Sequence, residues 1–159
     1  MPHLRLSRRA LIFSLAACFT PVGGARAADE ASVKKGDKTM SGSDVSWVFS
    51  VTIKDGAVEK LKAIIAEMAD GAKASEPGTL GYEWSISDDG KNGQVHEHYR
   101  DSEAALTHLA SFNENFAARL MELVEPTGMV VFGEPSAALK KELEGADPVY
   151  MQPAGGFVR

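Results

Sequence analysis

The chain has 159 residues, of which 44% are hydrophobic and 25% charged, and its formal net charge at pH 7 is -5. This length and this ordinary globular composition predict a single folded domain. The acidic balance, without a Lys/Arg cluster in the body of the chain, argues against a nucleic-acid-binding surface, and no apolar run approaches the roughly 18 residues needed to span a bilayer.

Residues 1–27 have the layout of an export signal. The basic opening MPHLRLSRR precedes the short apolar stretch ALIFSLAACF, and ARA at residues 25–27 forms a small-x-small cleavage site. The adjacent Arg8 and Arg9 resemble a twin-arginine signal. We therefore expect export to the periplasm with cleavage after Ala27.

The same segment allows a second interpretation. The sequence LAAC, which ends at Cys18, resembles a lipobox, in which Cys18 would become a lipidated N-terminus tied to a membrane. Contact with a membrane is expected only under this alternative. Since Cys18 is the only cysteine, cleavage after Ala27 would leave no disulfide, thiol nucleophile or thiolate metal ligand.

A lead-in, a strand and a helix are expected after the signal. Residues 28–45 are polar, which predicts a flexible segment. SWVFSVTIK at residues 46–54 alternates apolar and polar side chains and predicts a strand. In residues 57–75 the apolar side chains recur at helical spacing, which predicts a helix that ends before the turn pair Pro77 and Gly78.

A hairpin and a capped helix are expected next. Residues 79–87 and 94–100 alternate in polarity and flank the turn sequence DDGKNG. Asp101 or Ser102 then supplies the side-chain oxygen that caps a helix.

Two short helices and two short strands are expected in the rest of the chain. The segment NENFAARLMELV at residues 113–124 has helical spacing, and Pro126 is predicted to end it. A buried strand is expected within residues 127–134, a short helix at 136–143 and an edge strand at 148–152.

The order of these elements predicts an α+β fold. A β-α-β-β-α-β order is typical of a ferredoxin-like antiparallel sheet with helices packed on one face. The domain is expected at residues 46–135, followed by an extension at 136–159. The other face of the sheet needs a cover, because Trp47 and Phe49 are not expected both to point at the chain's own helices, so we predict a homodimer.

Three of the four histidines lie within residues 95–112. Side chains alternate along a strand, so His96 and His98 share one face and Glu97 points to the other, toward the predicted helices. A three-histidine metal site would need His108 on the face of His96 and His98, whereas the helix pattern favours the opposite face. We therefore expect His96 and His98 on a polar outer or inter-subunit face, and no metal.

Glu97 and His108 form the candidate site. A carboxylate that faces the helices must be hydrogen-bonded or have a raised pKa, and His108 is the nearest helical polar residue. The pair has two interpretations, which are a structural hydrogen bond between helix and sheet, or the polar corner of a pocket for a flat small molecule. The aromatic residues expected to line that pocket are Tyr82, Trp84, Phe112 and Phe116.

These residues resemble a known family. EHYRDSEAALTH, from Glu97 to His108, together with EPGTLGYE, from Glu76 to Glu83, resembles the antibiotic biosynthesis monooxygenase (ABM) family, which includes quinol monooxygenase-like proteins. The resemblance covers about residues 47–134. It implies an intertwined dimer of ferredoxin-like units, a dimeric α+β barrel.

The resemblance also implies a chemistry. It implies oxygenation of a quinol-like or phenolic aromatic by molecular oxygen without any cofactor. His108 would accept the hydroxyl proton or hydrogen-bond to the substrate, and Glu97 would orient it. Tyr99, with Tyr82 and Trp84, would shape the pocket.

Two function classes stay open at this point. The first is a cofactor-independent monooxygenase, and the second is a non-catalytic module that binds a small aromatic on the same fold. A related haem-degrading branch uses an Asn, a Trp and an axial His, and the sequence departs from it: the first strand contains no Asn, and Tyr99 stands two residues after Glu97.

Overall fold

The computed structural model describes residues 43–152 and 154–155. The predicted signal with its cleavage after Ala27, the alternative lipidation of Cys18 and nearly all of the predicted lead-in fall within residues 1–42, outside the described residues. Among the helices of the described ranges, none is both long and apolar enough to cross a membrane.

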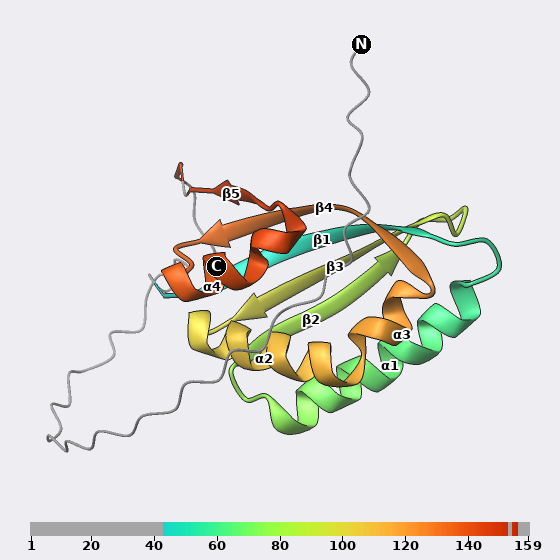
Figure 1. Ribbon diagram of the computed structural model, residues 1–159, viewed down its shortest axis with the longest axis horizontal. Coiled ribbons are helices and arrows are strands. Elements are labelled where there is room, and N and C mark those ends of the chain that lie inside the picture. Colours follow the sequence, from blue (N-terminus) through green and yellow to red (C-terminus); the bar gives the residue numbers. More distant parts are fainter. Residues whose placement is uncertain (1–42, 153, 156–159) are drawn as a thin grey trace, which may run out of the picture.

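One five-stranded sheet with helices on one side makes up the described chain (Figure 1). The elements in chain order are β1 (Val45–Ile53), α1 (Val58–Ser75), β2 (Thr79–Ile86), β3 (Asn92–Tyr99), α2 (Ser102–Asn115), α3 (Ala117–Met121), β4 (Val124–Gly133), α4 (Ala137–Leu143), the 3-10 helix η1 (Glu144–Ala146) and β5 (Val149–Met151). The strands lie in the order β2-β3-β1-β4-β5, and neighbours are antiparallel except β4 and β5, which are parallel.

This arrangement confirms the predicted α+β class and the ferredoxin-like order of elements. The expected edge strand of the extension is present as β5. The start of α2 also follows the prediction, because the Asp101 carboxylate accepts a hydrogen bond from the Ala104 N–H over 2.8 Å. Such a cap satisfies one of the N–H groups that a helix leaves unpaired at its first turn.

The segment before β4 differs from the prediction. The expected helix over residues 113–124 is wrong at its end, residues 122–124, since α3 ends at Met121 and Pro126 lies inside β4. Val51 of β1 pairs with Pro126 at the point where the register of the two strands shifts. Proline has no N–H to give to a sheet, and an irregular position of this kind is where a strand tolerates it.

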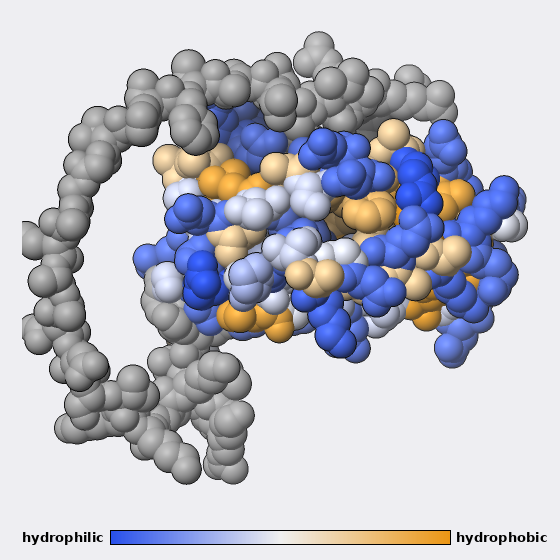
Figure 2. Space-filling view, turned by 90° about the horizontal axis from the view of Figure 1, so that it is seen from below, coloured by the Kyte–Doolittle hydropathy of each residue, from blue (hydrophilic) through white to orange (hydrophobic). Residues whose placement is uncertain are grey.

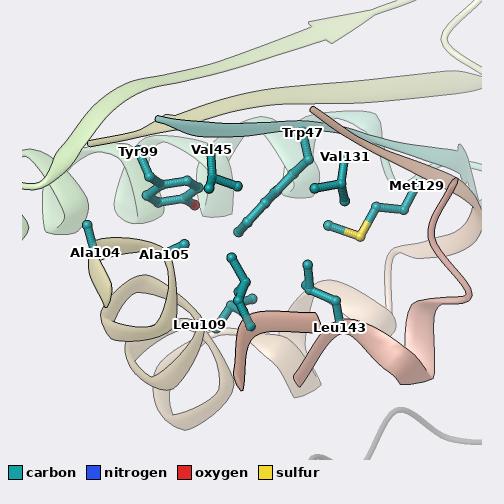
Figure 3. Close-up of a cluster of buried hydrophobic side chains, with 10 residues drawn as sticks. Val45, Trp47, Tyr99, Ala104, Ala105, Leu109, Met129, Val131 and Leu143 are labelled. Atoms are coloured by element: carbon teal, nitrogen blue, oxygen red, sulfur yellow. The ribbon is translucent and has the colours of Figure 1, made fainter. Parts of the chain in front are cut away.

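Two hydrophobic clusters fill the space between the sheet and the helices. The first packs β1, β3 and β4 against α2 and α4, and Figure 3 shows the Trp47 side chain extending from the sheet toward Leu109 and Leu143. The second packs the other end of β1 against α1, with Leu61, Ile64 and Met68 as its buried helical residues.

Trp47 and Phe49 both face these clusters, so the argument that predicted a homodimer from them is wrong. Trp47 is 1% exposed, and Phe49 packs against both clusters. The physical reason is the alternation of a strand, because residues two apart share a face. Burying a large side chain there stabilises the fold by about 2 kcal/mol, and α2 and α4 are placed to provide that burial. Any case for a second copy must rest on the opposite face.

Candidate active site

His108 lies on the sheet-facing side of α2. Its neighbours along this side, Ala104, Ala105 and Leu109, are buried as well. The small side chains of Ala104 and Ala105 bring the helix close to the sheet, and the imidazole of His108, with 8% of its side chain exposed, therefore lies within reach of β3.

Two carboxylates hold the two ring nitrogens of His108. The Nδ1 atom lies 2.7 Å from Glu76 Oε2, and the Nε2 atom lies 3.2 Å from Glu97 Oε2. Both carboxylates are buried, with 6% of the Glu76 side chain and 9% of the Glu97 side chain exposed. We call Glu76, His108 and Glu97 together the Glu-His-Glu unit.

A hydroxyl group supports each carboxylate. The Thr79 hydroxyl donates a hydrogen bond to Glu76 Oε2 over 2.9 Å, and the Tyr99 hydroxyl donates a short hydrogen bond to Glu97 Oε2. Buried carboxylates need such partners, because an ion removed from water loses its hydration. The aromatic ring of Tyr99 packs in turn against Trp47, at 4.6 Å between ring centroids.

The two carboxylates favour the protonated form of His108. Each ring nitrogen lies against a carboxylate oxygen, and a carboxylate stabilises the charged form of an imidazole beside it. Burial lowers the pKa of His108, but the hydrogen bonds and charges of Glu97 and Glu76 outweigh it and raise the pKa above its ordinary value.

The turn between α1 and β2 places Glu76. The Glu76 N–H donates to the Ala72 carbonyl at the end of α1, over 2.9 Å, and the Arg100 N–H donates to the Gly78 carbonyl over 2.9 Å. A Cβ atom on Gly78 would lie only 2.5 Å from the Cβ of Ala104 on α2. A residue without a side chain is therefore required at position 78, and the close contact fixes the turn against the helix that carries His108.

A small cavity adjoins the unit. It leaves about 10 Å³ for the centres of water-sized spheres, about enough for one water molecule. Glu76 and His108 belong to its wall, and Glu97 does not. The other residues of the wall are Met68, Ala72, Tyr82, Ser111, Phe112 and Phe116.

Tyr82 presents a neutral hydroxyl at this cavity. Burial and the nearby charge of Glu97 raise its pKa well above the ordinary value, so the phenol stays protonated. The Trp84 Nε1–H donates to the Tyr82 oxygen over 3.1 Å, and the Tyr82 hydroxyl in turn lies 3.6 Å from the Met68 sulfur. Sulfur is a weak acceptor, so the Tyr82 proton is available to a better one.

A wider hollow, of about 430 Å³ by the same measure, lies on the other face of the sheet. Its wall contains serine, threonine, asparagine and glutamine side chains, which are Ser50, Ser85, Ser87, Asn92, Gln94 and Thr127, and no titratable residue. A hollow without an acid or a base offers no proton acceptor. The smaller cavity beside the Glu-His-Glu unit is therefore the candidate active site.

The structure brings most of the predicted residues together. His108 meets Glu97 as expected, and Tyr82, Phe112 and Phe116 line the cavity. Trp84 does not reach the wall and instead holds the Tyr82 hydroxyl.

Tyr99 lies behind Glu97, among hydrophobic core residues rather than on the wall. From this position Tyr99 hydrogen-bonds to the Glu-His-Glu unit but does not contact the cavity.

Glu76 is the site residue that the sequence does not predict. The predicted turn is the pair Pro77 and Gly78, and Glu76 belongs only to the stretch that carries the family resemblance. A chemical argument could have predicted a second partner for His108. A buried imidazole has two nitrogens that need hydrogen-bond partners, and Glu97 is a partner for only one of them.

His96 and His98 lie on the opposite face of β3, as predicted. His96 is exposed, and His98 Nε2 lies 3.2 Å from the Asp44 carboxylate. Within residues 43–152 and 154–155, no group of three or more His, Cys, Asp and Glu side chains is arranged to hold a metal ion.

The surface in Figure 2, seen from below the view of Figure 1, is mainly hydrophilic. Hydrophobic residues occur there in small groups between charged ones rather than as one broad patch. This is the surface expected of helices that bury one side against a sheet and expose the other to solvent.

The ferredoxin-like sheet with helices on one face defines the class of protein, an α+β fold. The chain belongs to the antibiotic biosynthesis monooxygenase family, whose model matches residues 45–127. The predicted family is thereby confirmed. A search among curated proteins found no match.

Solved structures share the fold. MupZ from Pseudomonas fluorescens is 24% identical, with a TM-score of 0.66, over 74% of this chain and 95% of MupZ. Rv0793 from Mycobacterium tuberculosis is 26% identical, with a TM-score of 0.52, over 60% of this chain and 99% of Rv0793. SnoaB from Streptomyces nogalater, described as a cofactor-independent oxygenase, is 18% identical, with a TM-score of 0.50, over 60% of this chain and 96% of SnoaB.

Proposed function

We propose that the protein is a cofactor-independent monooxygenase that acts on a quinol-like or phenolic aromatic. The observation that carries the proposal is the buried Glu-His-Glu unit beside a cavity with aromatic walls. Membership of the family supports the type of reaction. A pocket of apolar walls with a few convergent polar groups is the usual form of a site for a flat small molecule.

The proposed reaction needs no reductant besides the substrate. A quinol and O₂ give a hydroxyquinone and water: one oxygen atom enters the ring, the other leaves as water, and the quinol supplies the electrons. The first step is loss of a hydroxyl proton, because the anion gives up electrons to O₂ more readily than the neutral quinol. A unit of two carboxylates and one imidazole contains groups that can take up that proton.

We propose that the substrate enters the cavity by displacing side chains of its wall. Space for about one water molecule is too small for an aromatic ring. Phe112, Phe116 and Met68 are the large apolar residues of the wall, and rotation of such side chains is the smallest change that would admit a ring. His108 and Phe112 already stack with their rings 13° from parallel, at 6.4 Å between centroids, a geometry that a flat ring could extend.

A non-catalytic module that binds a small aromatic is the alternative. The observation in its favour is that the unit's nitrogens and oxygens are all satisfied or solvent-accessible, as in a network that serves only to hold α2 to the sheet. Under this alternative the protein binds a phenol without consuming oxygen.

Oxygen uptake by the purified protein separates the two functions. A panel of reduced quinols is supplied without added cofactor, and the rate is compared with autoxidation in buffer. We expect uptake above that rate, its loss in His108→Ala, and its retention in His96→Ala, which removes an exposed imidazole from the other face. Saturable binding without uptake would contradict the monooxygenase and support the binding module.

We also propose that the protein is a homodimer. The described part of the chain has its helices on one face of the sheet (Figure 1), and on β5 the apolar residues Val149 and Met151 are 57% and 46% exposed. A second copy would cover such residues. Sedimentation of the purified protein should give twice the mass of the chain, and a monomer at micromolar concentration would contradict this.

Export to the periplasm is proposed from the sequence alone. Replacing Arg8 and Arg9 by lysine should leave the precursor in the cytoplasm, because the paired arginines are the signal that the twin-arginine route recognises. Fractionation of cells tests this outcome. Incorporation of labelled fatty acid that is lost in Cys18→Ser would instead support the lipoprotein alternative.

A further inference from the structure

We propose that Glu76 is the catalytic residue that takes the substrate's hydroxyl proton, and that His108 acts behind it as a positioning residue. The inference rests on the proposed function, in that it assumes a phenolic or quinol-like ligand in the cavity. It differs from the sequence-based hypothesis, in which His108 itself accepts the proton.

Neither ring nitrogen of His108 is free to accept a proton. Nδ1 is held by Glu76 at 2.7 Å and Nε2 by Glu97 at 3.2 Å, both from carboxylate oxygens. A substrate hydroxyl would have to displace one of these buried carboxylates to reach a nitrogen. The raised pKa of His108 agrees with this geometry, since a protonated imidazole has no lone pair to offer.

Only one of the two carboxylates reaches the cavity. Glu76 is part of the wall, whereas Glu97 lies beyond His108 and accepts a hydrogen bond from the Tyr99 hydroxyl. The hydrogen bonds of Glu76 from His108 and Thr79 both go to its Oε2 atom. In the described part of the chain no hydrogen bond reaches Oε1, and no fully buried side-chain oxygen lacks a partner. The Oε1 atom of Glu76 therefore has access to open space.

The groups around Glu76 suit the anion that would form. The protonated imidazole of His108 provides a positive charge next to the cavity, and Tyr82 offers a neutral hydroxyl from the wall. The titratable groups that face His108 are Glu76 from the turn after α1, Tyr82 from β2, and Glu97 and Tyr99 from β3. Glu97 keeps His108 charged while Glu76 becomes neutral.

The proton step is balanced within the site. The O–H bond of the substrate breaks, its proton bonds to Glu76 Oε1, and the electron pair stays on the substrate oxygen. The negative charge thus moves from Glu76 to the aryl oxide. His108 retains both of its protons throughout, and Glu97 is its remaining anionic partner after the step.

The experiment uses a nitrophenol, whose ionised form absorbs at a longer wavelength than its neutral form. It is added to the purified protein at a pH where the free compound is mostly un-ionised. Glu76→Gln keeps the size of the side chain and removes its basicity. The matched control is Glu83→Gln, an exposed glutamate on the other face of β2.

We expect the wild-type protein and Glu83→Gln to bind nitrophenol as its anion. Glu76→Gln should bind it mainly in the neutral form, with at least a tenfold lower ratio of anion to neutral compound. If uptake of oxygen is observed, Glu76→Gln should reduce its rate about a hundredfold or more, the usual contribution of a general base, while Glu83→Gln should stay within about twofold.

A second measurement uses only the wild-type protein and therefore does not depend on whether Glu76→Gln folds. The infrared difference spectrum of wild-type protein with and without nitrophenol should show a new protonated carboxyl band, since the proton ends on a carboxylate. A bound anion without that band, an anion bound equally by Glu76→Gln, or no saturable binding at all would overturn the inference. A bound anion with the band but without oxygen uptake would keep Glu76 as acceptor and reject only the monooxygenase.

Discussion

Glu97 and His98 are neighbours on β3, but their side chains enter two different environments. Glu97 lies under the helices, with His108 and Tyr99 as partners. His98 lies on the other face, with 29% of its side chain exposed and one carboxylate, that of Asp44, at 3.2 Å. Both faces thus contain an acid-histidine pair, and they differ in burial and in the number of partners.

The difference shows that chemistry depends on environment more than on residue type. Where water is excluded, each charge must be matched by protein groups, so Glu76, His108 and Glu97 hold one another in fixed positions. On the other face the Asp44 carboxylate is also buried, but water reaches the imidazole of His98 and weakens their interaction. The same two residue types therefore form a candidate catalytic unit on one face and a single part-exposed pair on the other.

Removing the buried imidazole should have the largest effect. His108→Ala leaves two buried carboxylates without the cation between them, and breaking a buried charge cluster in this way costs about 3 kcal/mol of unfolding free energy. Urea unfolding at pH 7 measures the loss, with His96→Ala as the control, which should stay within about 0.5 kcal/mol. Equal stability of the two variants would show that the two faces do not differ as described.

Removing the Tyr99 hydroxyl should have the next largest effect. Tyr99→Phe keeps the ring that packs against Trp47 but deprives Glu97 of a donor, and hydrogen bonds to charged groups contribute about 2 kcal/mol. Urea unfolding measures this as well. Tyr150→Phe is a suitable control, because that hydroxyl belongs to a half-exposed residue on β5. A loss no larger than the control's would mean that Glu97 has another partner.

The stability of the wild-type protein should depend on pH through His108. Its pKa is raised in the folded state, so the folded chain holds the proton more tightly than the unfolded chain. The resulting stabilisation is fully present below about pH 6.5, the ordinary pKa of histidine, and is lost as the pH rises through the raised value. Unfolding free energies at a series of pH values test this. This dependence of the unfolding free energy on pH should vanish in His108→Gln. An unchanged dependence in that variant would show that another group causes it.

The smallest effect is expected on the outer face. His98→Ala removes the part-exposed partner of the buried Asp44 carboxylate, and loss of one such partner costs about 1 kcal/mol. The loss should shrink further in high salt, whereas that of His108→Ala should not. A loss in His98→Ala that approached the one in His108→Ala would indicate that the outer face is covered in solution.

The sequence predicted the fold and one half of the site because both follow from local periodicity. Alternation along β3 placed Glu97 under the helices, and helical spacing placed His108 on the side that faces it. The element order then indicated the ferredoxin-like topology. These inferences needed only the direction in which each side chain points.

The rest depended on contacts between distant segments. Glu76 follows a helix in a turn, where no periodicity tells which way a side chain points, and 32 residues separate it from His108. Trp84 shares its face with Tyr82, but only the packed structure shows that it holds the hydroxyl instead of lining the cavity. Pro126 was interpreted as a helix stop, because the shift in register that admits it into β4 belongs to the pairing with β1.

The short strand β5 protects the edge of the sheet. It pairs in parallel with residues Val130, Val131 and Phe132 of β4, whose backbone would otherwise end the sheet with unpaired N–H and C=O groups. An uncovered edge of apolar, β-branched and aromatic residues is a template for strands of other molecules. Proteolytic removal of β5 would therefore expose this edge and favour aggregation, even with the site intact.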